Sequence, residues 1–261
     1  FVESFIDKWE STIDLRLYYH NGELPEDAPD APNVSYFSLD SDEDLTTFKN
    51  DNAEYNGKEP NGGYNYRMDV IKFCHKVFAI TNSANVGGYL VWLDADTVSK
   101  DHMSWSDIVN FAAPNEEAEV VHLGRTAIDY SETSFLSFNL NSTRTLEFLS
   151  DFRGMYTSHE VFGYREWHDG FVFTRLLNIH EEHGLNVYNM SPDCTDLNAF
   201  ATSELGKFLE HKKGNLKYNK EEESNQIPAM PVGPQRYAYI NSLVAFYERK
   251  NLLEVGTWNG D

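Results

Sequence analysis

Cysteine is scarce in this chain, whose 261 residues include only Cys74 and Cys194. Two cysteines are too few for a framework of several disulfides or for a thiolate metal cluster. The sequence therefore excludes a disulfide-rich secreted module and a four-cysteine zinc site. A reducing compartment is the simplest expectation, and we expect the cytoplasm.

Basic residues are also few. The chain has 21 Lys and Arg against 42 Asp and Glu, which gives a formal net charge of -21 at pH 7. A surface with this excess of negative charge repels the phosphates of nucleic acids and of anionic lipids. We therefore expect no nucleic-acid partner.

Long apolar runs are missing as well. No run approaches the roughly 18 residues of a membrane span, and the opening "FVESFIDKWE" lacks the basic and apolar regions of a signal peptide. We expect no membrane insertion. The chain begins without Met and stops at "LLEVGTWNGD", so we also expect a truncated N-terminus and a cut at the other end.

Aromatic residues, by contrast, are plentiful, at 14% of the chain. They indicate a packed core in spite of the acidity. Apolar periodicity alternates between strand and helix patterns over about the first 200 residues, which predicts an α/β domain with a parallel sheet. Strands are predicted at 12–20, 33–39, 87–93, 118–124, 135–141 and 185–190, and helices at 1–9, from Tyr64 to Phe78, near 104–111, from Ser142, and at 166–184.

Two segments interrupt this alternation. Residues 40–63 are acidic and rich in Gly and Asn, which predicts a long loop. Residues 226–235, "QIPAMPVGPQ", carry three prolines and predict a linker. We therefore expect one domain over residues 1–225, a Pro-rich linker over 226–235, and the start of a second domain over 236–261.

One acidic pair stands out from its surroundings. Asp-x-Asp occurs at Asp40, at Asp42 and at Asp94, but the first two lie in the charged segment, where solvated acids are ordinary. Asp94 and Asp96 instead follow the apolar run "GGYLVWL", and open α/β sheets bind ligands at the carboxyl ends of their strands. Two adjacent carboxylates repel each other unless a cation compensates them, and such oxygen ligands suit Mg²⁺ or Mn²⁺. We expect a metal site here.

The region around this pair resembles the nucleotide-sugar glycosyltransferases of the GT-A fold. The likeness rests on "RMDVIKFCHKVFAITNSANVGGYLVWLDADTVSKDHM", a helix leading to the acidic strand end, and on "SFNLNSTRTLEFLSDF". It implies a Rossmann-like, mainly parallel central sheet flanked by helices. It also implies that Asp94 and Asp96 hold Mn²⁺ or Mg²⁺ on the diphosphate of a nucleotide-sugar donor.

A second motif extends the likeness. His211, Gly214 and Lys217 form His-x-x-Gly-x-x-Lys, which resembles the C-terminal motif of retaining glycosyltransferases of the glycogenin class. The resemblance implies that His211 is the third metal ligand and that Lys217 contacts the diphosphate, with Gly214 permitting a close backbone approach. It implies hexosyl transfer, favours a UDP-sugar donor and a retaining mechanism, and leaves the acceptor open among glycans, proteins and small molecules.

Other residues are candidates for substrate contacts. Asp169, near the start of the predicted helix 166–184, is the candidate catalytic residue, contacting the donor sugar or the acceptor hydroxyl; in an inverting enzyme it would be the general base. Lys76 and Arg67, on the helix before the acidic strand end, are candidates for binding the nucleotide.

Two alternatives remain open. "WLDADTV" also resembles the first motif of haloacid-dehalogenase-type phosphatases, in which Asp94 would be the nucleophile and Asp96 the acid/base. The chain could also be a catalytically silent GT-A-like binding domain. Separately, "NLLEVGTWNG" resembles the opening motif of Rossmann-type S-adenosylmethionine methyltransferases, with Glu254 at the acidic position and Gly256 and Gly260 in the turn. It implies that residues 236–261 begin a methyltransferase-like domain.

Overall fold

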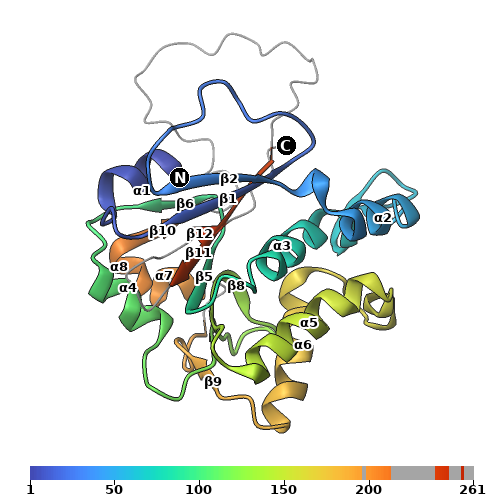
Figure 1. The fold of residues 1–261 in the computed structure, drawn as a ribbon. Helices are drawn as coiled ribbons and strands as arrows, with labels where there is room; N and C mark the ends of the chain where they lie inside the picture. The colour runs from blue at the N-terminus through green and yellow to red at the C-terminus, as the bar shows by residue number, and fades with distance from the viewer. Residues whose placement is uncertain (196–197, 213–238, 247–253, 256–261) are drawn as a thin grey trace, which may run out of the picture.

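The computed structural model describes residues 1–195, 198–212, 239–246 and 254–255. In this part of the chain a mixed sheet lies between two groups of helices (Figure 1), so the α/β prediction is confirmed. The sheet has eight strands in the order β2-β1-β11-β12-β5-β8-β7-β9. Their bounds are β1 (Leu15–His20), β2 (Val34–Ser38), β5 (Tyr89–Leu93), β7 (Val120–Leu123), β8 (Glu132–Asn139), β9 (Val187–Asn189), β11 (Tyr239–Phe246) and β12 (Glu254–Val255).

The helices cover both faces of the sheet (Figure 1). One face carries α2 (Glu43–Asp51), α3 (Val70–Asn82), α5 (Thr143–Thr157) and α6 (Asp169–Glu182), and the other α1 (Val2–Lys8), α4 (Trp105–Ala112), α7 (Ala199–Thr202) and α8 (Leu205–Phe208). Among the described helices, none combines the length and the apolar character that crossing a membrane requires.

Strand β5 is apolar throughout because it is covered on both sides. Leu90 and Trp92 belong to the core beneath α3, α5 and α6, whereas Val91 and Leu93 belong to the core on the other face. All four are fully buried. This two-residue alternation is the normal geometry of a strand, and a doubly covered strand needs apolar residues at both parities.

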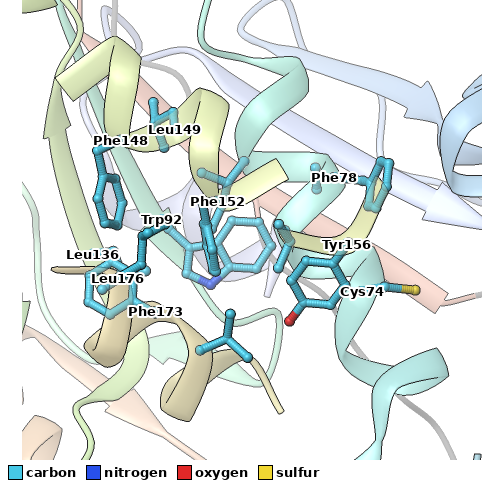
Figure 2. Packing of buried hydrophobic residues seen from close by; sticks show 14 of the residues in the cluster. Cys74, Phe78, Trp92, Leu136, Phe148, Leu149, Phe152, Tyr156, Phe173 and Leu176 are labelled. Atoms are coloured by element: carbon cyan, nitrogen blue, oxygen red, sulfur yellow. The ribbon is translucent and has the colours of Figure 1, made fainter. Parts of the chain in front are cut away.

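Trp92 anchors the larger of the two cores. Figure 2 shows its indole among side chains of α5 and α6, including Phe148, Phe152 and Phe173. Phe173 lies edge-on to Phe148 and to Phe152, with ring centroids 5.5 and 5.9 Å apart. Such edge-to-face contacts add to the free energy of apolar burial. The helices are thereby fixed against the strand that carries the acidic pair.

The prediction of a mainly parallel sheet is wrong. Parallel pairing occurs in β1–β2, β5–β12 and β7–β9, but β8 runs antiparallel to both of its neighbours, β5 and β7. Residues 124–131, which join β7 to β8, are too few for the crossover of a dozen or more residues that parallel neighbours need. The chain therefore turns back directly.

The long loop predicted over residues 40–63 is also wrong. A 3₁₀ turn, η1 (Leu39–Ser41), is followed by α2 and by a short strand, β3 (Asn56–Lys58). Asp42 caps α2, since its side chain accepts a hydrogen bond of 2.9 Å from the backbone N–H of Leu45. Leu45 and Phe48, three residues apart, then bury one face of the helix.

The helix predicted from Tyr64 begins later, at Val70. Residues before it form β4 (Tyr64–Asp69), which pairs antiparallel with β3. Asp69 caps α3 by accepting a hydrogen bond of 2.8 Å from the backbone N–H of Lys72. Arg67 was expected on the helix but consequently lies on an exposed strand.

The helix predicted at 166–184 also begins later, at Asp169, and His168 is its N-cap residue.

The predicted division into two domains is neither confirmed nor contradicted. Residues 226–235 lie outside the described residues, as does most of the segment 236–261. Its described strands β11 and β12 pair with β1 and β5 in the same sheet. The linker and the methyltransferase-like start therefore stay predictions.

A stacked pair of histidines joins β1 to α3. The rings of His20 and His75 lie 3.7 Å apart, centroid to centroid, and both side chains are buried. Burial, assisted by the charge of Lys49, lowers the pKa of His20 to about 4 from its usual 6.5. Burial also lowers the pKa of His75 well below that value, next to the His20 ring. Both rings are neutral in the folded protein at pH 7.

We expect the stability of the fold to fall as the pH is lowered from 6.5 towards 4. In this range the unfolded chain protonates His20 while the folded protein does not, so the histidine favours unfolding by roughly 2 kcal/mol at pH 5 compared with pH 7. Urea unfolding at several pH values should show a shallower dependence in His20→Phe. The exposed His102→Phe is the control and should keep the slope of the original chain; equal slopes in all three proteins would contradict the prediction.

Candidate metal centre

The acidic pair lies where β5 ends and a small second sheet begins. Asp94 directly follows Leu93, and Asp96 directly precedes β6 (Thr97–Ser99). Strand β10 (Leu209–His211) pairs antiparallel with β6 and sets His211 opposite Thr97. The backbone N–H of Lys212 also donates a 2.8 Å hydrogen bond to the carbonyl oxygen of Asp96. Two segments more than a hundred residues apart in sequence are thus joined at the end of the acidic strand.

The three predicted ligands converge in this place. His211 Nε2 lies 2.9 Å from Asp96 Oδ1 and 3.9 Å from Asp94 Oδ2. One ligand atom from each residue lies within 4.8 Å of the other two. Two carboxylates and an imidazole at this spacing could hold a divalent metal ion, and the oxygen-rich donor set fits Mn²⁺ or Mg²⁺.

Glu132 orients the imidazole and was not found from the sequence. His211 Nδ1 lies 3.2 Å from Glu132 Oε1, on the side of the ring opposite the acidic pair. The hydroxyl of Ser134 donates to the same carboxylate oxygen at 3.0 Å. A carboxylate behind a histidine ligand fixes the ring and directs Nε2 towards the metal. The sequence offers only a weak signal, an acid three residues before the apolar pair Phe135 and Leu136; in the structure Glu132 is 4% exposed and begins β8.

The protonation of these groups reflects their crowding. Burial opposes the charged imidazole, but hydrogen bonds to Asp96 and Glu132 outweigh it and raise the pKa of His211 to about 9. Burial also raises the pKa of Asp94, and the charge of Asp96 adds to the effect, while Lys76 acts against it. Without a cation, the centre therefore holds a proton on His211, and a metal ion would have to displace it.

A buried lysine supplies positive charge on the other side of Asp94. Lys76, on α3, is 6% exposed, and its Nζ lies 2.7 Å from Asp94 Oδ1 and 2.7 Å from Asp169 Oδ2. It also donates to the carbonyl oxygen of Thr133 at 3.1 Å. Asp94 Oδ1 accepts a further 2.8 Å hydrogen bond from the indole of Trp92. One oxygen of Asp94 is thus held by the core, and the other faces His211.

Asp169 is the second partner of this lysine. It begins α6 and is 4% exposed. Its Oδ2 accepts hydrogen bonds from Lys76 and, at 2.5 Å, from the hydroxyl of Thr133. Burial favours the neutral acid, but the charges of Lys76 and His168 and these hydrogen bonds prevail and lower the pKa of Asp169. The carboxylate is therefore ionised, with one oxygen engaged.

The structure brings five of the predicted site residues together. Asp94, Asp96, His211, Lys76 and Asp169 form one cluster, although Lys76 is enclosed by carboxylates where a nucleotide contact was expected. Arg67 is exposed, with its Nε 3.5 Å from Glu166 Oε2. Gly214 and Lys217 lie outside the described residues. Cys74 is fully buried in the core.

No protein-family model matches this chain, and no curated protein matches it either.

We expect loss of the Lys76 charge to destabilise the fold strongly. Lys76→Met leaves Asp94 and Asp169 buried without their shared cation, and breaking a buried ion pair costs roughly 3–5 kcal/mol. Urea denaturation measures the loss. The matched control, Lys207→Met, removes an exposed pair with Glu204 and should cost about 1 kcal/mol or less. Adding Asp169→Asn to Lys76→Met should restore part of the stability, because one buried charge is removed. An equal loss of stability in Lys76→Met and Lys207→Met would contradict the structural role given to Lys76.

We also expect the centre to bind Mn²⁺ through Asp94, Asp96 and His211. Calorimetric titration of the full chain should show one site that Asp96→Asn abolishes or weakens severely, because a ligand is lost. Glu132→Gln should weaken binding by about ten- to a hundredfold, since it leaves the ligands in place and removes the group that orients His211. Asp7→Asn, at the surface, is the control. Unchanged affinity in Asp96→Asn would rule the site out.

Proposed function

We propose that this protein is a metal-dependent glycosyltransferase that moves a hexosyl group from a nucleotide-diphosphate sugar, in the first instance a UDP-sugar, to an acceptor. The observation that carries the proposal is the meeting of Asp94, Asp96 and His211 at the end of a buried strand. The sequence resemblance to GT-A glycosyltransferases independently names these three residues as metal ligands. The acceptor, whether a glycan, a protein or a small molecule, stays open.

The chemistry requires charge compensation at a leaving diphosphate. A divalent ion held by Asp94, Asp96 and His211 would supply Lewis-acid stabilisation of that group. Other residues of the protein fix the orientation of these ligands. Glu132 orients the imidazole, and Lys76 and Trp92 bind one oxygen of Asp94 so that the other oxygen faces His211. Ligands fixed before the substrate arrives need no reorganisation during the reaction.

Asp169 has a narrower role than the sequence suggested. Its Oδ2 is engaged by Lys76 and Thr133, so a donor sugar or an acceptor hydroxyl would be contacted only through Oδ1. A carboxylate with a lowered pKa is a weak general base. This argues against proton abstraction by Asp169 and favours the retaining mechanism, in which the leaving phosphate takes the acceptor proton. Lys217, which would support that phosphate, stays a prediction.

We expect the full chain to transfer or hydrolyse a UDP-sugar in the presence of Mn²⁺. Asp96→Ala should lower this activity by at least about a hundredfold, and chelation with EDTA should do the same, because both remove the stabilisation of the leaving diphosphate. Release of UDP, measured across a panel of nucleotide sugars, is the readout. Asp44→Ala is the control, because it removes an exposed acid from the Asp-x-Asp cluster that carries no metal role.

The same assays separate the alternatives. Hydrolysis of an aryl phosphate that Asp94→Asn abolishes would favour a phosphatase with Asp94 as its nucleophile. Binding of UDP that Mn²⁺ does not strengthen, together with no turnover of any nucleotide sugar, would favour a catalytically silent binding domain. Full activity in Asp96→Ala would exclude the metal-dependent mechanism altogether.

A further inference from the structure

Away from the metal centre, a cavity of about 410 Å³ is lined by residues from β1, α2, β3, β4 and α3. None of the five clustered residues of the metal centre lines it. Its lining is basic although the chain as a whole is strongly acidic: it holds Lys49, Lys58 and Lys72 together with the stacked His20 and His75. A concentration of positive charge in an acidic protein needs a separate explanation.

In the part of the chain that the structure describes, these three lysines have no carboxylate partner. Within the described residues, Lys8, Lys76, Lys207 and Lys212 each form a salt bridge, whereas Lys49, Lys58, Lys72 and Lys100 form none. Three of the four described lysines without a carboxylate partner thus line one cavity, and the Nζ of one of them, Lys49, lies 3.5 Å from Asn21 Oδ1. Asp69 is the carboxylate in the lining, and its oxygens accept hydrogen bonds from the backbone N–H of Lys72 and, at 2.9 Å, from the hydroxyl of Tyr64. These neutral donors do not cancel the charge of Asp69, but three ammonium groups against one carboxylate leave the lining net positive, which favours an anion.

His75 adds a requirement for a hydrogen-bond donor. Its Nδ1 lies 3.2 Å from the carbonyl oxygen of Lys72, and since a carbonyl only accepts, Nδ1 carries the proton. The neutral ring then presents Nε2 as an acceptor. Nε2 is buried and has no hydrogen-bond partner among the described residues. A buried acceptor without a donor is costly, and a ligand hydroxyl would satisfy it.

The cavity also has room beyond a single ion. A phosphate group fills only part of it, and small-molecule sites commonly have volumes of this order. The ring of Tyr64, 54% exposed, lines the same space and offers a face to an organic moiety. The ligand is therefore expected to combine an anionic group, a hydroxyl group that donates a hydrogen bond, and an organic body.

We propose that this cavity binds the phosphate monoester of a hydroxylated small molecule, such as a sugar phosphate. Lys49, Lys58 and Lys72 would hold the phosphate, and a hydroxyl of the ligand would donate to Nε2 of His75. The inference goes beyond the proposed glycosyl transfer, because it requires neither the metal centre nor a nucleotide.

The test is calorimetric titration of the full chain with glucose 6-phosphate in EDTA, with glucose as the uncharged comparison. We expect saturable binding of the phosphate ester and none of glucose. Lys72→Gln should weaken binding by about tenfold or more, since a charge-assisted hydrogen bond is lost. Lys100→Gln removes the same charge outside the cavity and should leave the affinity unchanged. Absence of binding, or an equal loss in both variants, would overturn the proposal.

Methyl phosphate tests the donor requirement of His75, because it carries the phosphate monoester but no hydroxyl on its organic part. Glucose 6-phosphate should therefore bind more tightly than methyl phosphate in the same titration. Equal affinities would overturn the role given to His75. Asp96→Asn should bind glucose 6-phosphate like the original chain, whatever its effect on glycosyl transfer. Loss of binding in that variant would place the ester at the metal centre and overturn the proposal without deciding the proposed function.

Discussion

The arrangement of the centre depends on one buried ammonium group. Lys76 joins three elements, since it extends from α3 to Asp94 after β5 and to Asp169 at the start of the distant helix α6. Each of these charges would be prohibitively costly to bury alone, and together they are tolerated because the distances are short and Thr133 and Trp92 supply further hydrogen bonds. These contacts fix the positions of the Asp94 and Asp169 carboxylates relative to the sheet. Loss of any one of the three side chains would leave a buried charge without its partner.

Core packing and site geometry meet at Trp92. Its ring belongs to the apolar cluster beneath α5 and α6, while its Nε1 donates to Asp94 Oδ1. A substitution that loosens Phe152 or Phe173 would therefore act on the acidic pair through the indole, without touching any polar residue. This explains why an apolar strand leads directly into two carboxylates: burial of the strand holds the acids still.

The sequence predicted the parts of this centre that have strong local patterns. An apolar run ending in Asp94 and Asp96 identifies a strand end, and the spacing of His211, Gly214 and Lys217 selects one histidine among nine. Glu132 and the pairing of Lys76 were missed because they depend on which strands are neighbours, and β8 was expected in a mainly parallel sheet. The helix α2 was missed for a different reason. A loop was predicted from the composition of residues 40–63 as a whole, although Asp42 can cap a helix and Leu45 and Phe48 have helical spacing.

Formal charge explains why a cation suits this centre better than a proton. Four carboxylates, those of Asp94, Asp96, Glu132 and Asp169, surround Lys76 and His211. With His211 protonated, four negative charges meet two positive ones, which leaves two in excess. Exchange of that proton for a divalent ion would leave one in excess, and Asp94, Asp96 and Nε2 of His211 would be its ligands. Removing the ion without a proton leaves three, the least favourable state in a partly buried site. The charge of Glu132 stabilises the protonated ring of His211 when no metal is bound, and it would stabilise a metal-bound ring as well. Glu132 would thus keep Nε2 directed at the acidic pair in both states.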